Sequence, residues 1–386
     1  MTEWIECTLD KLGEIVGGAT PSTKCEDYYG GSIPWITPKD LSSFKGRYIT
    51  SGERNITEKG LASCSAQMMP KDAVLFTSRA PIGYVAIASQ SVCTNQGFKS
   101  IVVNEKADPL FVYYLLKYNK DAIEAMGSGT TFKEVSGKTM RAVKVRIPLD
   151  VSYQKRIAAV LDSLDTKIEN NERINDNLLA QAQTLYKQFF PYGVQDDLPD
   201  GWRIGTVGEI IEIHDSKRIP LSGADRSKME KKIYPYYGAA SLMDLVDNYI
   251  FDGKYLLLGE DGTVDDDAGY PILQYVWGQF WVNNHAHILT GRLGYDVESL
   301  YMLFKQTPVK SIVTGAVQPK ISQANLRSVQ VVIPPEHNLR EYNDLVEPLF
   351  SLFRANEEEC KTFTALRDTL LPKLMSGEID VSAVQL

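Results

Sequence analysis

YQKRIAAVLDSLDTKIENNERINDNLLAQAQTLYKQFF occupies residues 153–190, contains neither Gly nor Pro, and is followed directly by Pro191. Apolar residues recur in it at alternating steps of four and three, which is the heptad pattern of a helix with one apolar stripe. At about 1.5 Å per residue the predicted helix is about 55 Å long, so its stripe needs a partner. Its seam is predicted to contain Leu161, Leu164, Ile168, Leu178 and Leu185.

A second stretch, residues 336–377, repeats the heptad pattern, and Gly377 marks its end. Both stripes carry polar residues near their middles, Asn171 and Asn356 among them. These residues either contact solvent or fix the register of paired helices, and the second interpretation is favoured. Because a whole domain lies between the two stretches, we expect them to pair antiparallel. The seam of the second stretch is predicted to contain Leu349, Leu352, Phe363, Leu366 and Leu370.

Each long helix is preceded by a matching segment, which indicates a tandem duplication. Residues 129–148 match residues 315–334 at a constant offset, and each copy ends in Ile-Pro. The predicted order is therefore domain, helix, domain, helix. The predicted segments are a first domain at 1–152, a central helix at 153–191, a second domain at 192–335, a C-terminal helix at 336–377 and a tail at 378–386.

Within each domain, short β-branched and aromatic runs are interrupted by Gly, Pro and Asn, which is typical of short strands joined by turns. Ala73–Thr77 and Val143–Ile147 are two such runs. The predicted fold class is α+β, with two tandem mixed α/β domains separated by two long helices that form an antiparallel coiled coil. Many short strands favour a curled sheet over a doubly wound one.

The 386-residue chain has a formal net charge of −8, whereas a free-standing nucleic-acid-binding domain usually has a strong basic excess. No apolar run reaches membrane-spanning length, and the N-terminus lacks an apolar signal segment. We therefore expect a cytoplasmic protein that has no membrane partner. The five Cys are widely spaced, so free thiols are expected.

Sequence motifs for catalysis are missing: the chain has neither a phosphate-binding loop nor a dinucleotide fingerprint, and it lacks the Asn/Asp-Pro-Pro-aromatic motif of amino-methyltransferases. His285 and His287 would share one face of a strand. With no third ligand evident, they are expected to line a surface, and no metal site is predicted. We expect a chain without catalytic residues of its own.

Three further features complete a pattern. They are the segment IPWITPKDL at residues 33–41, the junction QKRIA at 154–158 and the segment LDSLDTKI at 161–168. Together with the duplicated domain-helix order, they make nearly the whole chain resemble the specificity subunit of type I restriction-modification systems. No single motif decides this; their order, in duplicate, does.

The resemblance implies a DNA-binding role. Each domain would be a target recognition domain that reads one half of a split sequence in double-stranded DNA, and the antiparallel coiled coil would set the gap. Two modification subunits would dock on the helices and carry S-adenosylmethionine. Restriction subunits would add ATP- and magnesium-dependent translocation and cleavage. This chain would supply specificity and hold no cofactor.

Polar residues in loops are the candidates for base and phosphate contact, because Arg and Lys suit guanine while Asn and Gln suit adenine. For any one of them an ordinary surface or turn role is the commoner outcome, whereas as a set they are expected to include the DNA face. The candidates are Thr37, Lys39, Thr77, Ser78, Arg79, Thr130, Thr131 and Lys133 in the first domain, and Tyr236, Lys254, Asn283, Asn284, Gln318 and Lys320 in the second.

The acidic balance keeps one alternative open. Duplicated domains on a coiled-coil rod would also serve as a non-catalytic scaffold that binds proteins or glycans, and the charge of −8 favours that reading. If the chain does bind DNA, its partners must supply much of the phosphate neutralisation, and binding by the chain alone should be weak and salt-sensitive.

Overall fold

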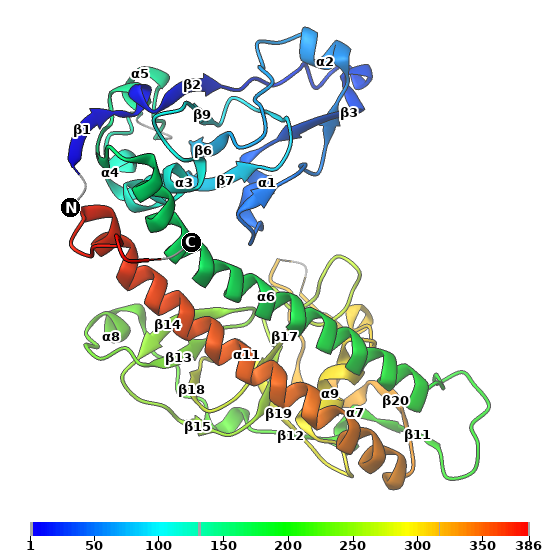
Figure 1. Ribbon diagram of the computed structural model, residues 1–386. Coiled ribbons are helices and arrows are strands. Elements are labelled where there is room, and N and C mark those ends of the chain that lie inside the picture. Colours follow the sequence, from blue (N-terminus) through cyan, green and yellow to red (C-terminus); the bar gives the residue numbers. More distant parts are fainter. Residues whose placement is uncertain (1–2, 130–132, 316, 385–386) are drawn as a thin grey trace. The chain divides into compact units, whose positions relative to one another are not determined.

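The computed structural model describes residues 3–129, 133–315 and 317–384. Figure 1 shows the elements in chain order. Within the part of the chain that the structure describes, no helix combines the length and apolarity needed to cross a membrane.

The chain divides into two compact units, which we call the first unit (1–172 with 357–386) and the second unit (173–356). Two long helices, α6 (Val151–Phe189) and α11 (Glu336–Ser376), contribute to both units. Each unit therefore consists of one domain and the parts of both long helices that pack on it.

The first unit contains a five-stranded sheet, a three-stranded sheet and a two-stranded pair. The five-stranded sheet has the order β2 (Gly13–Gly17), β9 (Lys99–Val103), β6 (Val74–Ser78), β7 (Ile82–Ala88), β4 (Tyr48–Ile49). The three-stranded sheet has the order β5 (Asn55–Ile56), β3 (Tyr29–Ile36), β8 (Cys93–Thr94). The two-stranded pair is β1 (Trp4–Thr8) with β10 (Lys144–Pro148). The helices are η1 (Leu9–Lys11), η2 (Glu26–Tyr28), α1 (Pro38–Ser42), α2 (Glu58–Ala62), α3 (Pro109–Tyr118), α4 (Lys120–Ala125) and α5 (Gly137–Ala142).

Helix α3 joins the sheet of the first unit to α6. Pro109 occupies the first turn, and Asp108 caps the helix by accepting a hydrogen bond from the Phe111 amide at 3.0 Å. The helix packs against β6 and β7, and Phe111 shares one apolar core with Phe76 of β6 and Ile157 of α6. The domain and the long helix are therefore parts of one hydrophobic core.

The second unit contains two four-stranded sheets and a two-stranded pair. One four-stranded sheet has the order β12 (Ile211–Ile213), β19 (Ala286–Gly291), β16 (Tyr255–Gly259), β17 (Leu273–Val276). The other has the order β14 (Leu242–Val246), β13 (Tyr234–Tyr237), β18 (Gln279–Val282), β15 (Phe251–Asp252). The two-stranded pair is β11 (Arg203–Thr206) with β20 (Gln330–Ile333). The helices are α7 (Val207–Ile210), η3 (Asp215–Lys217), α8 (Gly223–Ser227), α9 (Val297–Phe304), η4 (Lys310–Ile312) and α10 (Gln323–Ser328).

Strand pairing confirms the tandem duplication and the α+β class. The antiparallel pair β1–β10 of the first unit corresponds to β11–β20 of the second. The parallel pair β3–β8 corresponds to β13–β18. The antiparallel pair β6–β9 corresponds to β16–β19. The sequence offset therefore marks a repeat of the fold as well as of the chain.

The two long helices run antiparallel within each unit. In the first unit, Asn171 of α6 donates to Glu359 of α11 at 3.0 Å, and Arg367 of α11 donates to Asp165 of α6 at 2.7 Å. Moving forward along α6 thus corresponds to moving backward along α11. The predicted seam residues Leu161 and Leu164 are buried here, Ile168 is half-buried, and Phe363 and Leu370 of α11 are half-buried as well.

In the second unit, Asn356 of α11 donates to Asn175 of α6 at 2.8 Å, and Asn175 donates to the Phe353 carbonyl at 3.3 Å. Tyr342 donates to the Ala182 carbonyl at 3.1 Å. Leu178 is buried, and Leu185 and Leu349 are half-buried. The polar seam positions are therefore bonded to each other across the helix pair.

The seam prediction is wrong for two residues of α11. Leu352 is 48% exposed and Leu366 is 44% exposed, whereas the half-buried residues Phe353 and Arg367 follow each of them directly. Helix α11 packs against a domain as well as against α6, since Phe350 meets Tyr275 edge to face with ring centroids 5.2 Å apart. An apolar face that serves two surfaces is wider than a two-position stripe, so its periodicity alone did not identify the residues at the helix contact.

Candidate nucleic-acid interface

Each domain has one loop closed in the same way. In the first domain the Ser128 and Glu134 backbones exchange two hydrogen bonds, of 3.0 and 2.9 Å. In the second domain Thr314 and Lys320 do the same, at 2.9 and 2.7 Å. The two closing pairs differ by the offset of the sequence repeat, so they are structural equivalents. Thr130 and Thr131 lie outside the described residues.

Both loops end beside the same part of the sheet. The Val135 amide donates to the Ser78 carbonyl at the end of β6 at 3.0 Å, and the Ile321 amide donates to the Glu260 carbonyl after β16 at 2.8 Å. Beside each of these points is a turn in which an Asn side chain accepts a bond from the amide two residues later, Asn95 in one domain and Asn283 in the other. The strand end, the turn and the loop together form what we call the loop base.

The loop base of the first domain carries two cations around one acid. Glu134 lies 3.5 Å from the Arg79 guanidinium and 3.6 Å from the Lys99 ammonium. Lys133, just inside the loop, is exposed. Lys39 is also exposed and pairs with Glu53 at 2.7 Å. Hydrogen bonding to Glu53 and its charge raise the pKa of Lys39, so this ammonium stays charged at neutral pH.

The loop base of the second domain carries a larger charged network. Glu260 accepts from Arg218 at 2.5 Å and lies 3.3 Å from the Lys320 ammonium. His287, which is fully buried, bonds Asp215. Burial alone would raise the pKa of Asp215, but hydrogen bonding to His287 and the charges of His287 and Arg218 hold it below its ordinary value.

Two predicted contact residues of the first domain, Thr77 and Ser78, are inaccessible, and a third, Thr37, is half-buried. Thr77 and Ser78 are fully buried, and the Thr77 hydroxyl accepts from the Tyr84 amide at 2.8 Å. Thr37 caps α1 and donates its hydroxyl proton to Asp40 at 2.6 Å. These hydroxyls serve strand and helix ends, because short polar side chains satisfy nearby backbone groups.

In the second domain the predicted contact residues Tyr236 and Asn283 are buried, whereas Lys254 is half-exposed and held by ion pairs. Tyr236 is 1% exposed, and its hydroxyl accepts from the Leu221 amide at 3.2 Å. Asn283 is 5% exposed and forms the turn described above. Lys254 bonds Glu298 at 2.7 Å and Glu347 at 3.2 Å, so it ties the domain to α11. Burial would lower the pKa of Lys254, but these bonds raise it above its ordinary value.

The remaining candidates lie at the two loop bases or near them and reach solvent. Lys39, Lys133, Asn284, Gln318 and Lys320 are exposed, and Arg79 is half-exposed. Sequence reasoning missed the acids Glu134 and Glu260, because acidic residues were not sought among the candidate contacts. It also placed His287 on a surface, whereas the ring is buried. The constant offset between the copies was the signal that would have aligned Glu134 with Lys320.

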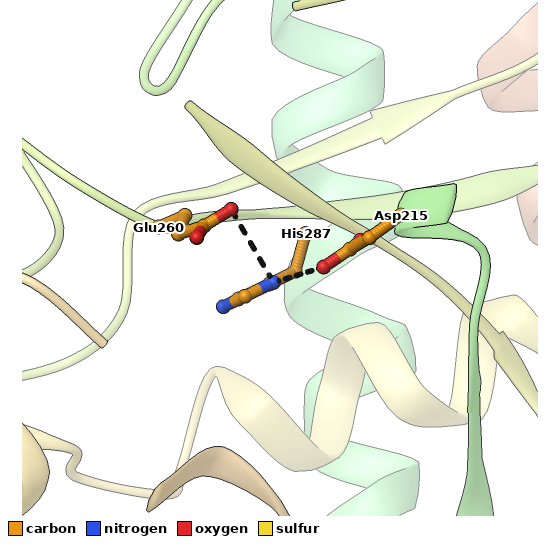
Figure 2. Close-up of side chains that lie close together, drawn as sticks. All are labelled: Asp215, Glu260 and His287. Atoms are coloured by element: carbon orange, nitrogen blue, oxygen red, sulfur yellow. Dashed lines mark hydrogen bonds and ion pairs between the residues drawn. The ribbon is translucent and has the colours of Figure 1, made fainter. Parts of the chain in front are cut away.

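One group of three His, Asp and Glu side chains among the described residues has its ligand atoms within 4.8 Å of one another: Asp215, Glu260 and His287. Figure 2 shows the imidazole beside both carboxylates. Arg218 already pairs with Asp215 at 3.4 Å and with Glu260. Both ring nitrogens of His287 also face oxygen acceptors. A divalent cation would have to displace these interactions, so the arrangement favours an ion-pair network.

The family model for the type I restriction modification DNA specificity domain matches residues 1–180 and 199–359. The chain belongs to this family. The resemblance seen in the sequence motifs is thereby confirmed, and the two matched ranges follow the duplication.

Two type I specificity subunits are similar to this chain in sequence, and one solved structure is similar to it in fold. The MjaIX specificity subunit of Methanocaldococcus jannaschii is 31% identical over 410 residues, which cover 98% of this chain and 94% of that protein. The EcoR124I/EcoR124II specificity subunit of Escherichia coli is 28% identical over 193 residues, or 48% of this chain and 46% of that protein. The crystal structure of a type I S subunit from M. genitalium has a TM-score of 0.60 at 18% identity, covering 97% and 96% of the two chains, and supports the fold.

Proposed function

We propose that this chain is the DNA-recognition subunit of a type I restriction-modification complex and that it has no catalytic role of its own. Each domain reads one half of a bipartite site. The observation that carries this proposal is the pair of equivalent loops, Ser128–Glu134 and Thr314–Lys320, closed by the same backbone bonds. Two equivalent readers in one chain are what a split site requires.

The charges of the loop bases suit sequence reading better than strong binding. Arg79 and Lys133 in the first domain and Gln318 and Lys320 in the second offer the donors that base edges and phosphates accept. Glu134 and Glu260 offset part of this positive charge. With a net charge of −8, the chain alone should bind DNA weakly, and the modification subunits would supply the remaining phosphate contacts.

The long helices would set the gap between the half-sites and dock two modification subunits. Leu352 in the second unit and Leu366 in the first are exposed apolar side chains on α11. Burial of such side chains against a partner would be favourable. S-adenosylmethionine would be held by the modification subunits, while ATP and magnesium would be held by the restriction subunits of a complete complex.

Methylome sequencing tests the proposal directly. Cells that express this chain with its neighbouring modification subunit should gain methyl-adenine at one split motif. Replacing residues 193–335 with those of another specificity subunit should change one half of that motif and leave the other half intact. The proposal fails if the complex assembles with a modification subunit known to be active and no sequence-specific mark is found. A protein-binding scaffold would then be the better account.

A further inference from the structure

A buried imidazole connects the sheet of the second domain to its loop. His287 of β19 is fully buried. Its Nε2 lies 2.8 Å from the Ile321 carbonyl oxygen, and its Nδ1 lies 2.6 Å from Asp215 Oδ2. Both partners are oxygen atoms that accept hydrogen bonds, so the two ring nitrogens together can hold both of them. Ile321 directly follows Lys320, which closes the loop, so the ring holds the point where the chain leaves the loop.

Asp215 holds the same segment at a second point. Its Oδ2 accepts from Gln323 Nε2 at 2.6 Å, and its Oδ1 accepts from the Ile288 amide at 3.0 Å. Asp215 begins η3, Ile288 belongs to β19, and Gln323 is the first residue of α10. One carboxylate therefore ties three segments together, and charge-assisted bonds of this kind are the stronger ones.

The network continues to a side chain at the end of the loop. Arg218 donates to the Ala286 carbonyl at 2.8 Å and pairs with Glu260. The other carboxylate oxygen of Glu260 lies 3.3 Å from the Lys320 ammonium. The Glu260 carboxylate thus orients the Lys320 side chain, nearly half of which remains exposed.

The first domain has a different residue at the matching position. Thr77 bridges Phe98 and Gly259 pairs with Ala286, so the next residues, Lys99 and His287, are equivalent by register. Lys99 donates to the Phe98 carbonyl at 3.2 Å and lies 3.6 Å from Glu134. A nitrogen-bearing side chain therefore lies at the end of the loop in both domains. In the first domain Lys99 forms a partly exposed pair, and in the second His287 belongs to a buried network.

We propose, on the basis of the DNA-reading function above, that His287 and Asp215 are positioning residues that fix the Gln318–Lys320 end of the loop and thereby set base discrimination in the second half-site. Neither residue touches DNA in this account. Their bonds to Ile321 and Gln323 hold this end in one orientation, in which Gln318 and Lys320 meet the base edges. A loop without this anchor would tolerate mismatched bases, since discrimination depends on precise placement of donors.

The test uses this chain assembled with its modification subunits and two DNA libraries, one with the second half-site randomised and one with the first. Methylated molecules are sequenced to give discrimination at each position. The variant H287L removes both donors, H287Q keeps one, and H287K restores both with the residue type found at Lys99. The matched variant in the first domain is K99L.

Discrimination in the second half-site should fall by roughly tenfold or more in H287L, as expected for the loss of bonds to a charged group and a carbonyl. H287Q should lie between, and H287K should return most of the loss. The first half-site should be unchanged in all three variants. K99L should change only the first half-site, and by less, because its pair with Glu134 is partly exposed.

H287L removes one partner of the buried Asp215 carboxylate and can impair folding, so the double variant D215N/H287L, which also removes the carboxylate charge, serves as a second test. Folding is checked by urea unfolding and by first half-site methylation. Unchanged second half-site discrimination in a folded variant would overturn the inference, as would an equal loss at both half-sites. Stoichiometric zinc retained by the wild type and lost in H287L would also overturn it. Absence of any split-motif mark from the wild type would instead defeat the proposed function.

Discussion

The two loop bases have the same backbone hydrogen bonds, but the sheet and the loop contribute charges of opposite sign in the two domains. In the first domain the sheet supplies the cations Arg79 and Lys99, and the loop supplies Glu134. In the second domain the sheet side supplies Glu260, and the loop supplies Lys320. Backbone bonds close both loops in the same way, so side chains can exchange sign without a change of fold. The duplicated backbone thus leaves the side chains of each copy free to diverge.

The attachment of each domain to the long helices shows the same contrast. In the first unit the domain supplies the cation: Arg47 donates to Glu169 of α6 at 3.0 Å and also pairs with Asp162. In the second unit both sides supply one: Arg354 of α11 donates to Glu298 of the domain at 3.1 Å, and Lys254 of the domain pairs with Glu347 of α11 at 3.2 Å. Asp162 and Glu169 are about one-third exposed, whereas Glu298 is fully buried.

The largest expected effect comes from the buried attachment. R354M should lower the free energy of unfolding of the second unit by about 3 kcal/mol, because Glu298 loses a partner inside the protein. R47M should cost the first unit roughly 1–2 kcal/mol, since water can reach the acids it leaves behind. Hydrogen exchange of peptides from each unit under increasing urea measures both. Equal losses in the two units would break the comparison.

The polar seam residues sharpen the contrast at a smaller scale. N356A should destabilise the second unit by about 1–2 kcal/mol, because Asn356 is buried and bonds Asn175. N171A should change the first unit by less than about 0.5 kcal/mol, because its bond to Glu359 is exposed. Urea unfolding of the two variants decides the matter, and a larger loss in N171A would contradict the role given to burial.

Salt dependence separates the exposed lysines. In the assembled complex, K133A should reduce the slope of log K against log salt by about 0.9, the value for one lost phosphate contact. K320A should reduce it by less, because Glu260 already neutralises part of that charge. K39A is the matched comparison within the first domain, because it removes an ammonium that pairs with Glu53. Titrations of DNA binding at several salt concentrations provide the slopes; a larger change in K39A than in K133A would rule out Lys133 as a phosphate contact.

The smallest effect on folding is expected at the exposed leucines of α11. L352S and L366S should change the free energy of unfolding by less than about 0.5 kcal/mol, because both side chains already contact water. The same variants should lose modification subunits during co-purification. L164S, at a buried seam position, is the control that should cost stability. Full retention of the modification subunits by both exposed variants would exclude this face of α11 as their docking surface.

The sequence by itself determined the duplication, the α+β class, the two long helices and the family, because offsets, heptads and ordered motifs are local or periodic signals. It located the equivalent loops as well, through the match of residues 129–148 to 315–334. All five predicted seam residues of helix α6 are buried or half-buried, as its heptad indicated.

Only the tertiary structure decided which polar residues face solvent. Thr77, Tyr236 and Asn283 have the residue types of DNA contacts, but neighbouring backbone and side chains occupy their polar atoms. His287 looked like a surface residue until β19, η3 and the segment after the loop enclosed it. Burial and hydrogen-bond partners arise from segments far apart in the chain, so residue type and local spacing cannot supply them.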